Sequence, residues 1–489
     1  MKILTGKQIH ELDKHTISQE HISSLDLMER AALHMTEYLA GHYDRGTLFC
    51  IFVGKGNNGG DGLAIARMMT ERGFPCTVYT LFEPEETVED YRLNLERMPV
   101  EVTYVRFDSK NPPVLPPGSV IIDALLGVGI VGEAREPVSS AIRFINTAGR
   151  EVVSVDMPSG LMTEFGNGDN LTVMADMTLT LEFPSLSLLL PEGGECGGKV
   201  VVIPIGLNEK FMENAPSPYY YVTEDDLKYL RELRPVFSHK GDYGHTLLIC
   251  GSENMMGAAV LATGGALRSG CGLVTTHVPK NERAIIHITY PPALVSADKS
   301  SRFTELPHDL EPYTSIGIGC GIGQAPETLK AFKELLRTYR QPMVIDADGI
   351  NLLSSRPELL PLVPPGSILT PHVGELRRLI GPWSNDREKL DKATELAASM
   401  NCYIVIKGAY TVICEPQGRF WFNSTGNPGM AKGGSGDVLT GLMAGLLAKG
   451  IPSHIAAIFG VFLHGKAGDD AAARWGKESM NAQHLIEFL

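Results

Sequence analysis

Short runs of apolar and β-branched residues alternate along this chain with segments of helical periodicity, and the alternation occurs twice. In the first half the strand-like runs cover residues 47–53, 76–81, 102–107, 119–122 and 152–155. In the second half they cover residues 245–250, 273–278, 315–319, 343–346, 367–370 and 403–406. Strand–helix alternation is typical of parallel sheets covered by helices. We therefore predict two doubly wound α/β domains.

A stretch with no clear period separates the two halves at residues 204–224, where Pro, Asn and Gly are mixed. We interpret it as a linker, which divides the chain into domains at 1–214 and 225–489. The net charge is −14 and falls almost entirely in residues 1–220, so the two halves differ in surface charge. An acidic surface argues against binding to a nucleic-acid backbone.

None of the eight cysteines lies at a spacing typical of a metal site, and several lie within apolar strand-like runs. Reduced core thiols are therefore favoured over a disulfide framework. The longest apolar stretch, at 455–463, is too short to cross a bilayer, and residues 1–10 contain no apolar signal core. We expect a soluble, cytoplasmic protein that binds neither membranes nor nucleic acids.

The strand-like run at 47–53 leads into a glycine-rich segment, VGKGNNGGDGLAIAR, and a helix is expected to begin near Asp61. Glycines let a ligand approach the backbone, and a helix N-terminus offers free N–H groups to an anion. The segment is neither a Walker A loop nor a GxGxxG motif. A plain tight turn is the alternative. Because Asn57, Asn58 and Asp61 place three polar side chains in one turn, we favour a binding loop.

Two later strand-like runs end in an acidic residue that precedes a glycine-containing loop: Asp123 before LLGVGIVGE, and Asp156 before MPSG. The carboxyl ends of adjacent parallel strands meet at one edge of a sheet, which would bring Asn58, Asp123, Asp156 and Ser159 together. Oxygen atoms of this kind suit a hard cation, or a carboxylate held for proton transfer. Taken singly, either aspartate could equally be a turn or helix-capping residue.

Four separated motifs, LMERAA, GKGNNGGDGL, DALLGVGI and DMPSG, make residues 1–214 resemble the NAD(P)H-hydrate epimerase family. The resemblance implies a Rossmann-like three-layer fold and a potassium ion held by Asn58, Asp123 and Ser159. It implies Asp156 as the acid/base for inversion at C6 of the hydrated nicotinamide ring. Val128 departs from the family, which often has a small polar residue there. Contacts to the hydrate are implied for a larger set: Asn57, Asn58, Gly59, Gly60, Asp61, Gly127, Val128, Gly129, Ile130, Val131, Gly132, Glu133 and Asp156.

The second half carries the strongest local signal in the chain, STGNPGMAKGGSGDVLTGLMAGLLA at 424–448. Its glycines lead into an apolar helix that is expected to start near Asp437. Backbone N–H groups of residues 434–436 can form an anion hole at this helix N-terminus. Asp437 lies beside it, where a carboxylate could accept a proton from a hydroxyl that attacks a phosphoryl group. Helix capping alone is the simpler alternative, but the NPG and double-glycine turns disfavour it.

Five further segments accompany this one: GSENMMGAAVLATGGALRSGCGLV, GIGCGIG, VIDADGINLL, LTPHVGEL and IKGAYT. Together they make residues 225–489 resemble the ribokinase-like, ADP-dependent NAD(P)H-hydrate dehydratases. The resemblance implies Asp437 as the catalytic base and a hydrate site at Ala258, Gly321, His372 and Asp437. It implies an adenine nucleotide, bound with Mg²⁺, at Lys407, Gly408, Ala409, Tyr410, Thr411 and Gly436.

Three positions in this half leave alternatives open. Lys432 and Val373 stand where the family commonly has Thr and Pro, and Lys432 would add a cation near the phosphates. His372 in isolation would more often be structural, but its place after a strand, within TPHVGE, favours a ligand contact.

The two resemblances together imply a bifunctional repair enzyme for hydrated NADH and NADPH. The first half would interconvert the R and S hydrates, and the second would return the S form to NAD(P)H with ADP, releasing AMP and phosphate. We expect the hydrates of NADH and NADPH (NADHX and NADPHX) and ADP as ligands. We also expect the protein to form a homo-oligomer. Two alternatives remain at this point: a small-molecule kinase of the hydroxymethylpyrimidine or pyridoxal type, and a first half that is a non-catalytic scaffold.

Overall fold

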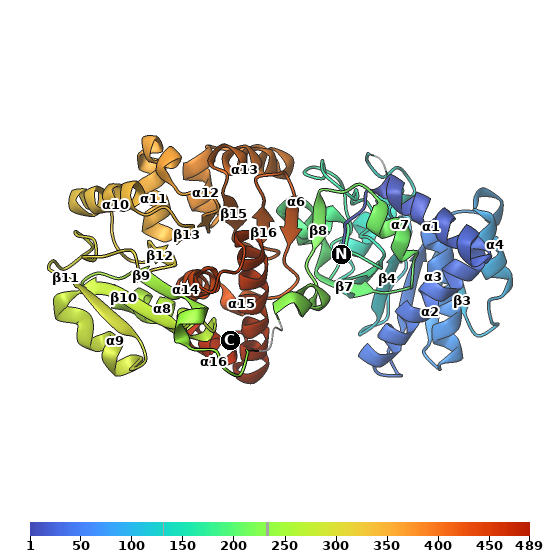
Figure 1. The fold of residues 1–489 in the computed structure, drawn as a ribbon. Coiled ribbons are helices and arrows are strands. Elements are labelled where there is room, and N and C mark those ends of the chain that lie inside the picture. Colours follow the sequence, from blue (N-terminus) through green and yellow to red (C-terminus); the bar gives the residue numbers. More distant parts are fainter. Residues whose placement is uncertain (131, 231–233) are drawn as a thin grey trace. The chain divides into compact units, whose positions relative to one another are not determined.

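The computed structural model describes residues 1–130, 132–230 and 234–489, and it divides into two compact units, Met1–Tyr219 and Tyr220–Leu489 (Figure 1). Each unit has its own sheet and its own buried hydrophobic clusters. Val131, one of the residues implied in hydrate binding, lies outside the described residues.

The first unit is built on a seven-stranded sheet with the order β3-β2-β1-β4-β5-β6-β7, in which every adjacent pair is parallel. The chain moves outward from β1 to β3 and then crosses back to β4. This reversal creates a topological switch point at the carboxyl ends of β1 and β4, where α/β sheets bind ligands. The predicted α/β fold is confirmed. The strands are β1 (Phe49–Val53), β2 (Cys76–Thr80), β3 (Thr103–Arg106), β4 (Val120–Ala124), β5 (Glu151–Val155), β6 (Met177–Leu181) and β7 (Lys199–Ile203).

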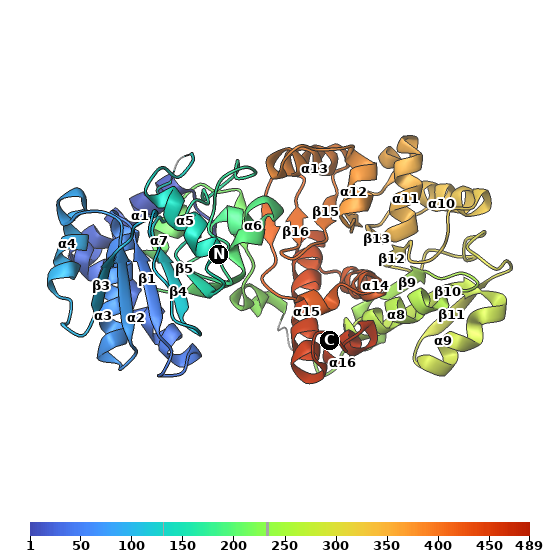
Figure 2. The ribbon, with the colours of Figure 1, turned by 180° about the vertical axis from the view of Figure 1, so that it is seen from behind.

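Helices cover both faces of this sheet. On one face lie α1 (Gly6–Glu20), α2 (Ser24–His42) and α3 (Asn57–Glu71), and on the opposite face lies α5 (Val138–Thr147), which the view from behind brings forward (Figure 2). Capping boxes at Thr5 and Ser23 set the beginnings of α1 and α2. The shorter elements are η1 (Pro84–Glu86), α4 (Glu89–Glu96), η2 (Leu186–Leu189), α6 (Pro191–Gly197) and α7 (Glu209–Asn214).

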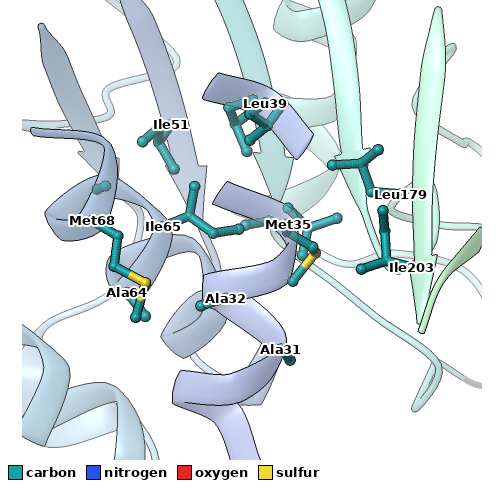
Figure 3. Packing of buried hydrophobic residues seen from close by; sticks show 14 of the residues in the cluster. Ala31, Ala32, Met35, Leu39, Ile51, Ala64, Ile65, Met68, Leu179 and Ile203 are labelled. Carbon is teal, nitrogen blue, oxygen red and sulfur yellow. The ribbon is translucent and has the colours of Figure 1, made fainter. Parts of the chain in front are cut away.

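The larger buried cluster of this unit lies between α2, α3 and the sheet (Figure 3). Met35 and Leu39 of α2 lie near Ile65 of α3 and Ile51 of β1, and all four are inaccessible to solvent. Burying a side chain of this size stabilises the fold by about 1.5–3 kcal/mol. The packing therefore fixes α3, whose first turn carries the glycine-rich segment.

The second unit is built on a ten-stranded sheet with the order β11-β10-β9-β12-β13-β14-β15-β16-β17-β8. The strands from β11 to β15 are parallel, whereas β15, β16 and β17 pair antiparallel. The chain order reverses between β9 and β12, which places a second switch point there. The strands are β8 (Tyr219–Tyr221), β9 (His245–Ile249), β10 (Leu273–Pro279), β11 (Leu294–Asp298), β12 (Ser315–Ile318), β13 (Met343–Ile345), β14 (Ile368–Leu369), β15 (Tyr403–Ile406), β16 (Val412–Cys414) and β17 (Phe420–Phe422).

Three helices, α8 (Met256–Arg268), α14 (Ser435–Ala448) and α15 (Ser453–Trp475), supply much of the main buried cluster of this unit. α8 and α14 lie in close contact, because a Cβ on Gly441 would come within 1.8 Å of the Ala262 carbonyl oxygen. The other helices are α9 (Arg283–Thr289), α10 (Pro326–Thr338), α11 (Ala347–Ser355), α12 (Val373–Ile380), α13 (Asp386–Met400) and α16 (Ala482–Phe488). The 3-10 helices are η3 (Glu224–Leu230), η4 (Lys240–Tyr243), η5 (Lys280–Glu282), η6 (Pro357–Leu362) and η7 (Pro428–Met430).

Three boundaries differ from those expected from the sequence. α3 begins at Asn57 rather than near Asp61, and α14 begins at Ser435 rather than at Asp437. Both starts are glycine-rich, and the packing leaves little room for a side chain at either: a Cβ on Gly59 would lie 2.0 Å from the Gly54 carbonyl oxygen, and a Cβ on Gly434, the N-cap of α14, would lie 2.4 Å from the Leu261 side chain. The stretch at 204–224 is not irregular throughout, since it contains α7, capped by the Asn208 side chain, and β8.

Within residues 1–130, 132–230 and 234–489, no helix combines the length and the apolar character needed to cross a membrane.

Candidate functional site

Asp123, on β4, is fully enclosed in the first unit and bonded on both carboxylate oxygens. Its Oδ1 accepts hydrogen bonds from the Ser159 hydroxyl at 2.6 Å and the Leu125 N–H at 3.3 Å. Its Oδ2 accepts from the Ser154 hydroxyl at 2.8 Å and the Ser159 N–H at 2.9 Å. Burial raises the pKa of Asp123, and these hydrogen bonds oppose the shift. Asp123 therefore ties β4 to β5 and to the loop after β5.

Asn58 is buried in the first turn of α3, and neither atom of its side-chain amide has a hydrogen-bond partner in the described part of the chain. Leaving such a group unpaired costs about 1–3 kcal/mol, so the amide points to a ligand that the chain does not supply. A Cβ on Gly127 would lie 3.4 Å from Asn58 and 3.1 Å from the Asp156 carboxylate. Asn58, Gly127 and Asp156 therefore line one site, at the carboxyl ends of β1, β4 and β5.

Asp156 directly follows β5 and has a left-handed backbone conformation, with φ of 65°. Non-glycine residues seldom adopt this conformation, and such strain is concentrated at functional sites. Burial raises the pKa of Asp156 to about 6; the charge of Asp13 adds to the shift, and backbone hydrogen bonds from Val128 and Leu181 oppose it. Burial also raises the pKa of Asp61 well above its ordinary value, and the negative charges of Asp156 and Asp13 raise it further. Carboxyl groups that titrate near neutrality are suited to proton transfer.

The other residues implied in hydrate contact lie around this group. Asn57 is exposed at the start of α3, and Gly59 and Gly60 are buried behind it. The loop after β4 is more open: Val128 and Ile130 are half-buried, and the remaining positions are exposed, namely Gly129, Gly132 and Glu133.

In the second unit, α14 begins with no side-chain cap at its N-terminus. Gly434 precedes it with φ of 95°, and a Cβ there would also lie 2.4 Å from Leu261, so only glycine fits. The first N–H groups of the helix are therefore open to an anion. Asp437 lies in this first turn, where burial raises its pKa to about 6, while a hydrogen bond from Cys320 and the charge of Lys407 oppose the shift.

An ion pair lies beside this helix start. The Lys407 ammonium is 2.7 Å from Oδ1 of Asp346, which follows β13, and the Thr440 hydroxyl donates to Oδ2 at 3.0 Å. A Cβ on Gly436 would lie 3.3 Å from both Lys407 and Asp346. Burial lowers the pKa of Lys407, but the charges of Asp346 and Glu375 outweigh it and the pKa is raised overall. Lys407 is therefore a fixed cation at the N-terminus of α14.

His372 forms the N-cap of α12. Its ring Nδ1 accepts the backbone N–H of Gly374 at 2.9 Å and that of Glu375 at 3.4 Å. The Glu375 carboxylate in turn accepts the backbone N–H of His372 at 2.9 Å. Nδ1 is thus an acceptor, which assigns the proton to Nε2. His372 also pairs with Lys407 through an isolated β-bridge. The residue therefore has a structural role and still lies next to the Lys407 segment.

The remaining positions predicted in this half fall in two places. A Cβ on Gly321 would lie 3.2 Å from Ala258, so these two are adjacent. Thr411 closes the turn after β15, donating its hydroxyl to the Gly408 carbonyl at 3.1 Å and accepting the Gly408 N–H at 3.3 Å. Within that turn Gly408 and Ala409 are exposed, and Tyr410 is half-buried.

The Lys432 ammonium, expected to add a cation near the phosphates, is bonded to backbone carbonyls of the chain. It donates to the carbonyls of Met480 at 2.7 Å, Lys477 at 3.3 Å and Glu478 at 2.5 Å. Because a lysine has three N–H donors, all of them are used. Lys432 braces the glycine-rich segment against residues 477–480 and has no donor left for a nucleotide.

Residues 246–489 match the family described as NAD(P)H-hydrate dehydratase, and residues 24–187 match the family described as YjeF-related protein N-terminus. The bifunctional NAD(P)H-hydrate repair enzyme Nnr of Moorella thermoacetica is 35% identical over 508 aligned residues, with 100% of this chain and 96% of that protein covered. The chain belongs to the family of bifunctional NAD(P)H-hydrate repair enzymes. The enzyme of the same name from Coxiella burnetii is 32% identical, with 99% of this chain and 98% of that protein covered.

Among solved structures, the ADP/ATP-dependent NAD(P)H-hydrate dehydratase of Bacillus subtilis, co-crystallised with ATP and Mg²⁺, is 34% identical. The match has a TM-score of 0.49 and covers 55% of this chain and 95% of that chain. Membership of the NAD(P)H-hydrate repair family confirms both resemblances predicted from the motifs and favours them over a small-molecule kinase joined to a scaffold.

In this member of the NAD(P)H-hydrate repair family, sequence reasoning missed several residues at the two sites. Asp13 lies on α1, and burial raises its pKa to about 6. Nothing in the sequence placed α1 at the sheet edge, because that depends on tertiary packing. Asp346 could have been found, since it ends a strand within VIDAD as Asp123 and Asp156 end theirs.

His464, on α15, is a further missed residue of the second site. Its Nε2–H donates to the Ser435 carbonyl, with the two atoms 2.9 Å apart, and burial lowers its pKa to about 4. His464 is therefore neutral, and its hydrogen bond to the Ser435 carbonyl joins α15 to the first turn of α14.

Proposed function

We propose that the first unit interconverts the R and S hydrates of NADH and NADPH, and that the second unit dehydrates the S form with ADP as phosphoryl donor. One observation carries the proposal: each unit places a carboxyl group with a pKa of about 6, Asp156 or Asp437, at the ligand-binding edge of its sheet. The ligand-binding edge is set by the switch point in the parallel part of each sheet.

Epimerisation requires a bond at C6 of the hydrated ring to open and close again on the other face. C6 carries both the hydroxyl and the ring nitrogen, so opening is accompanied by proton transfer. Asp156 gives up and takes back that proton, since a group that titrates near neutrality serves as both acid and base. The amide of Asn58 and the backbone around Gly127 bind and orient the hydrate.

Dehydration begins when the oxygen of the C6 hydroxyl attacks the terminal phosphoryl group of the nucleotide and Asp437 takes the hydroxyl proton. The C6–O bond then breaks, phosphate leaves with the electron pair, and C5 loses its proton. The C5–C6 double bond of the dihydronicotinamide is restored, and ADP becomes AMP. The uncapped start of α14 and the Lys407 ammonium stabilise the charge on the transferring phosphoryl group.

Mg²⁺ bound with the nucleotide supplies charge neutralisation in phosphoryl transfer. In residues 1–130, 132–230 and 234–489, no group of three or more His, Cys, Asp or Glu side chains is arranged to hold a metal ion. We propose that the ion would arrive bound to the phosphates of ADP, and that Asp346 and Asp437 are the carboxylates that would face it.

Potassium fits the first unit on one condition. The unpartnered Oδ1 of Asn58 is free to bind a cation, but Asp123 already accepts four hydrogen bonds, which uses the lone pairs of a carboxylate. The Ser159 hydroxyl lies 3.2 Å from the Leu126 carbonyl. Rotation of that one hydrogen towards Leu126 would free a lone pair on Asp123 Oδ1 without moving a heavy atom, while Ser159 Oγ goes on accepting the Leu126 N–H at 2.8 Å.

We expect Asn58→Leu to weaken potassium binding by about 10-fold or more, because the substitution keeps the branched shape of the side chain and removes the oxygen ligand. Two titrations with potassium chloride measure this effect, one of the epimerisation rate and one of the melting temperature of the full chain. Sodium chloride at equal ionic strength is the control. If parent and variant respond to potassium alike, Asn58 is not a ligand.

Product analysis tests the proposed dehydratase reaction. With the S hydrate and ADP, absorbance of the dihydronicotinamide should return together with equimolar AMP and free phosphate. A phosphate ester that persists, with no return of absorbance, would instead identify a small-molecule kinase.

A further inference from the structure

A cavity of about 690 Å³ opens in the first unit, and residues of the edge strand β3 and of α4 contribute to its lining. Its volume lies within the range of small-molecule sites, roughly 300–1,000 Å³. The epimerisation chemistry at Asp156 uses none of the residues that line it. Its walls are largely apolar and aromatic, formed by Phe82, Tyr91, Leu95, Met98, Val102 and Tyr104.

Two charged side chains lie on the wall of this cavity. Glu83 follows β2 and Arg106 is the last residue of β3, and the two groups are 3.6 Å apart. Their side chains are 65% and 48% exposed, respectively. An exposed ion pair contributes little to stability, so either group can turn to a ligand at small cost.

Lys55 links the cavity to the candidate epimerase site. Its ammonium lies 5.3 Å from the centroid of the Phe82 ring, and its backbone carbonyl accepts the Val88 N–H at 3.1 Å. Lys55 also stands directly before Gly56, the N-cap of α3, which has no side-chain cap of its own. A cation and an uncapped helix N-terminus are suited to a diphosphate, and the buried, unpartnered amide of Asn58 lies in the same turn.

The strand order β3-β2-β1-β4-β5 is that of sheets that bind dinucleotides across the switch point. In such sheets an acidic residue beyond β2 contacts the 2′-hydroxyl of the adenosine ribose, or an arginine accommodates a 2′-phosphate. Glu83 and Arg106 have the chemistry and the position for these contacts. Asp156 and Gly127 lie on the β4–β5 side, where the hydrated ring binds. The β2–β3 side is then open to the other half of the dinucleotide.

We propose that this cavity binds the adenosine half of the hydrated dinucleotide, with the base against the apolar walls and the ribose 2′ position at Glu83 and Arg106. The inference rests on the proposed epimerase function and extends it to substrate selection. Arg106 favours the 2′-phosphate of NADPH hydrate, and Glu83 favours the free 2′-hydroxyl of NADH hydrate.

Amide hydrogen exchange of the full chain with and without saturating NADP⁺ tests the assignment independently of turnover. Because the method localises protection along the sequence, nucleotide binding in the second unit does not interfere. We expect slower exchange across residues 80–106 in the parent and in Arg92→Ala, whose exposed side chain on α4 does not line the cavity. Arg106→Ala should need about tenfold more NADP⁺ or higher to reach the same protection. Unchanged exchange across 80–106 in the parent would overturn the proposal.

Epimerisation without ADP supplies the second readout. Arg106→Ala should raise KM for NADPH hydrate about tenfold or more, with kcat unchanged, because a charge-assisted hydrogen bond is lost. The hydrate of reduced nicotinamide mononucleotide, which lacks adenosine, should show no change in KM. Equal effects on both substrates would overturn the role of the cavity. Protection across 80–106 in a chain that epimerises neither substrate would refute the proposed function and leave the cavity assignment standing.

Discussion

Asp437→Asn is expected to slow hydrate dehydration by about 100-fold or more, while epimer interconversion continues at the parental rate. The amide keeps the shape of the side chain in the first turn of α14 but does not accept the hydroxyl proton. The effect should fall on kcat, because Lys407 and the uncapped N–H groups that bind the phosphates are untouched. Dehydration of the purified S hydrate with ADP, followed by absorbance, measures it.

Asp391→Asn is the matched control, since this carboxylate is 67% exposed on α13. The pH profile is a further check. With a pKa of about 6, Asp437 is a base above that pH and protonated below it, so kcat of the parent should fall with acidification through pH 6. Turnover by Asp437→Asn within a few-fold of the parent would refute the role of this residue as base.

Asp156→Ala is expected to leave the R hydrate unconsumed on the time scale of turnover, while the S hydrate is repaired at the parental rate. Removal of a positioned acid/base should slow epimerisation by about 100-fold or more. Asp156→Asn is the better matched change, because asparagine tolerates the left-handed backbone at this position more readily than alanine. Chromatographic separation of the two hydrates over the early time course measures the effect before spontaneous epimerisation intervenes.

Asp169→Ala, at an exposed loop position of the same unit, should leave both hydrates consumed as in the parent. If Asp156→Ala and Asp156→Asn also consume both hydrates at the parental rate, epimerisation does not depend on this carboxyl group.

The α/β fold could be predicted from the sequence because alternating strand and helix patterns are local signals. The strands at 76–81 and 403–406 fall within about one residue of β2 and β15. Short elements were missed, such as α4, β16 and β17, because their few residues carry no period that separates them from loops. The starts of α3 and α14 were placed too late, because a run of glycines in a sequence indicates a turn. The packing that requires glycine within these helix starts is visible only in the structure.

The candidate sites were predictable where a strand ends in an acid or a glycine-rich loop, as at Asn58, Asp123, Asp156 and Asp437. Residues that reach the sites from elsewhere were not. Asp13 depends on where α1 packs, and His464 on how α15 lies behind α14. The donors of Lys432 could not be assigned from the sequence either, because the carbonyls that occupy them belong to residues 477–480.

One measurement tests the central claim, that the two units act in sequence on one damaged cofactor. A mixture of R and S hydrates is incubated with the full chain in three parallel reactions, which contain ADP, ATP or no nucleotide. With ADP, both hydrates should disappear and NAD(P)H should appear in equal amount, accompanied by AMP and phosphate; the ATP arm shows whether ATP replaces ADP as donor. Without nucleotide, the hydrates should only interconvert. Failure of NAD(P)H to appear in either nucleotide arm, or loss of the S hydrate alone while the R hydrate persists, would contradict it.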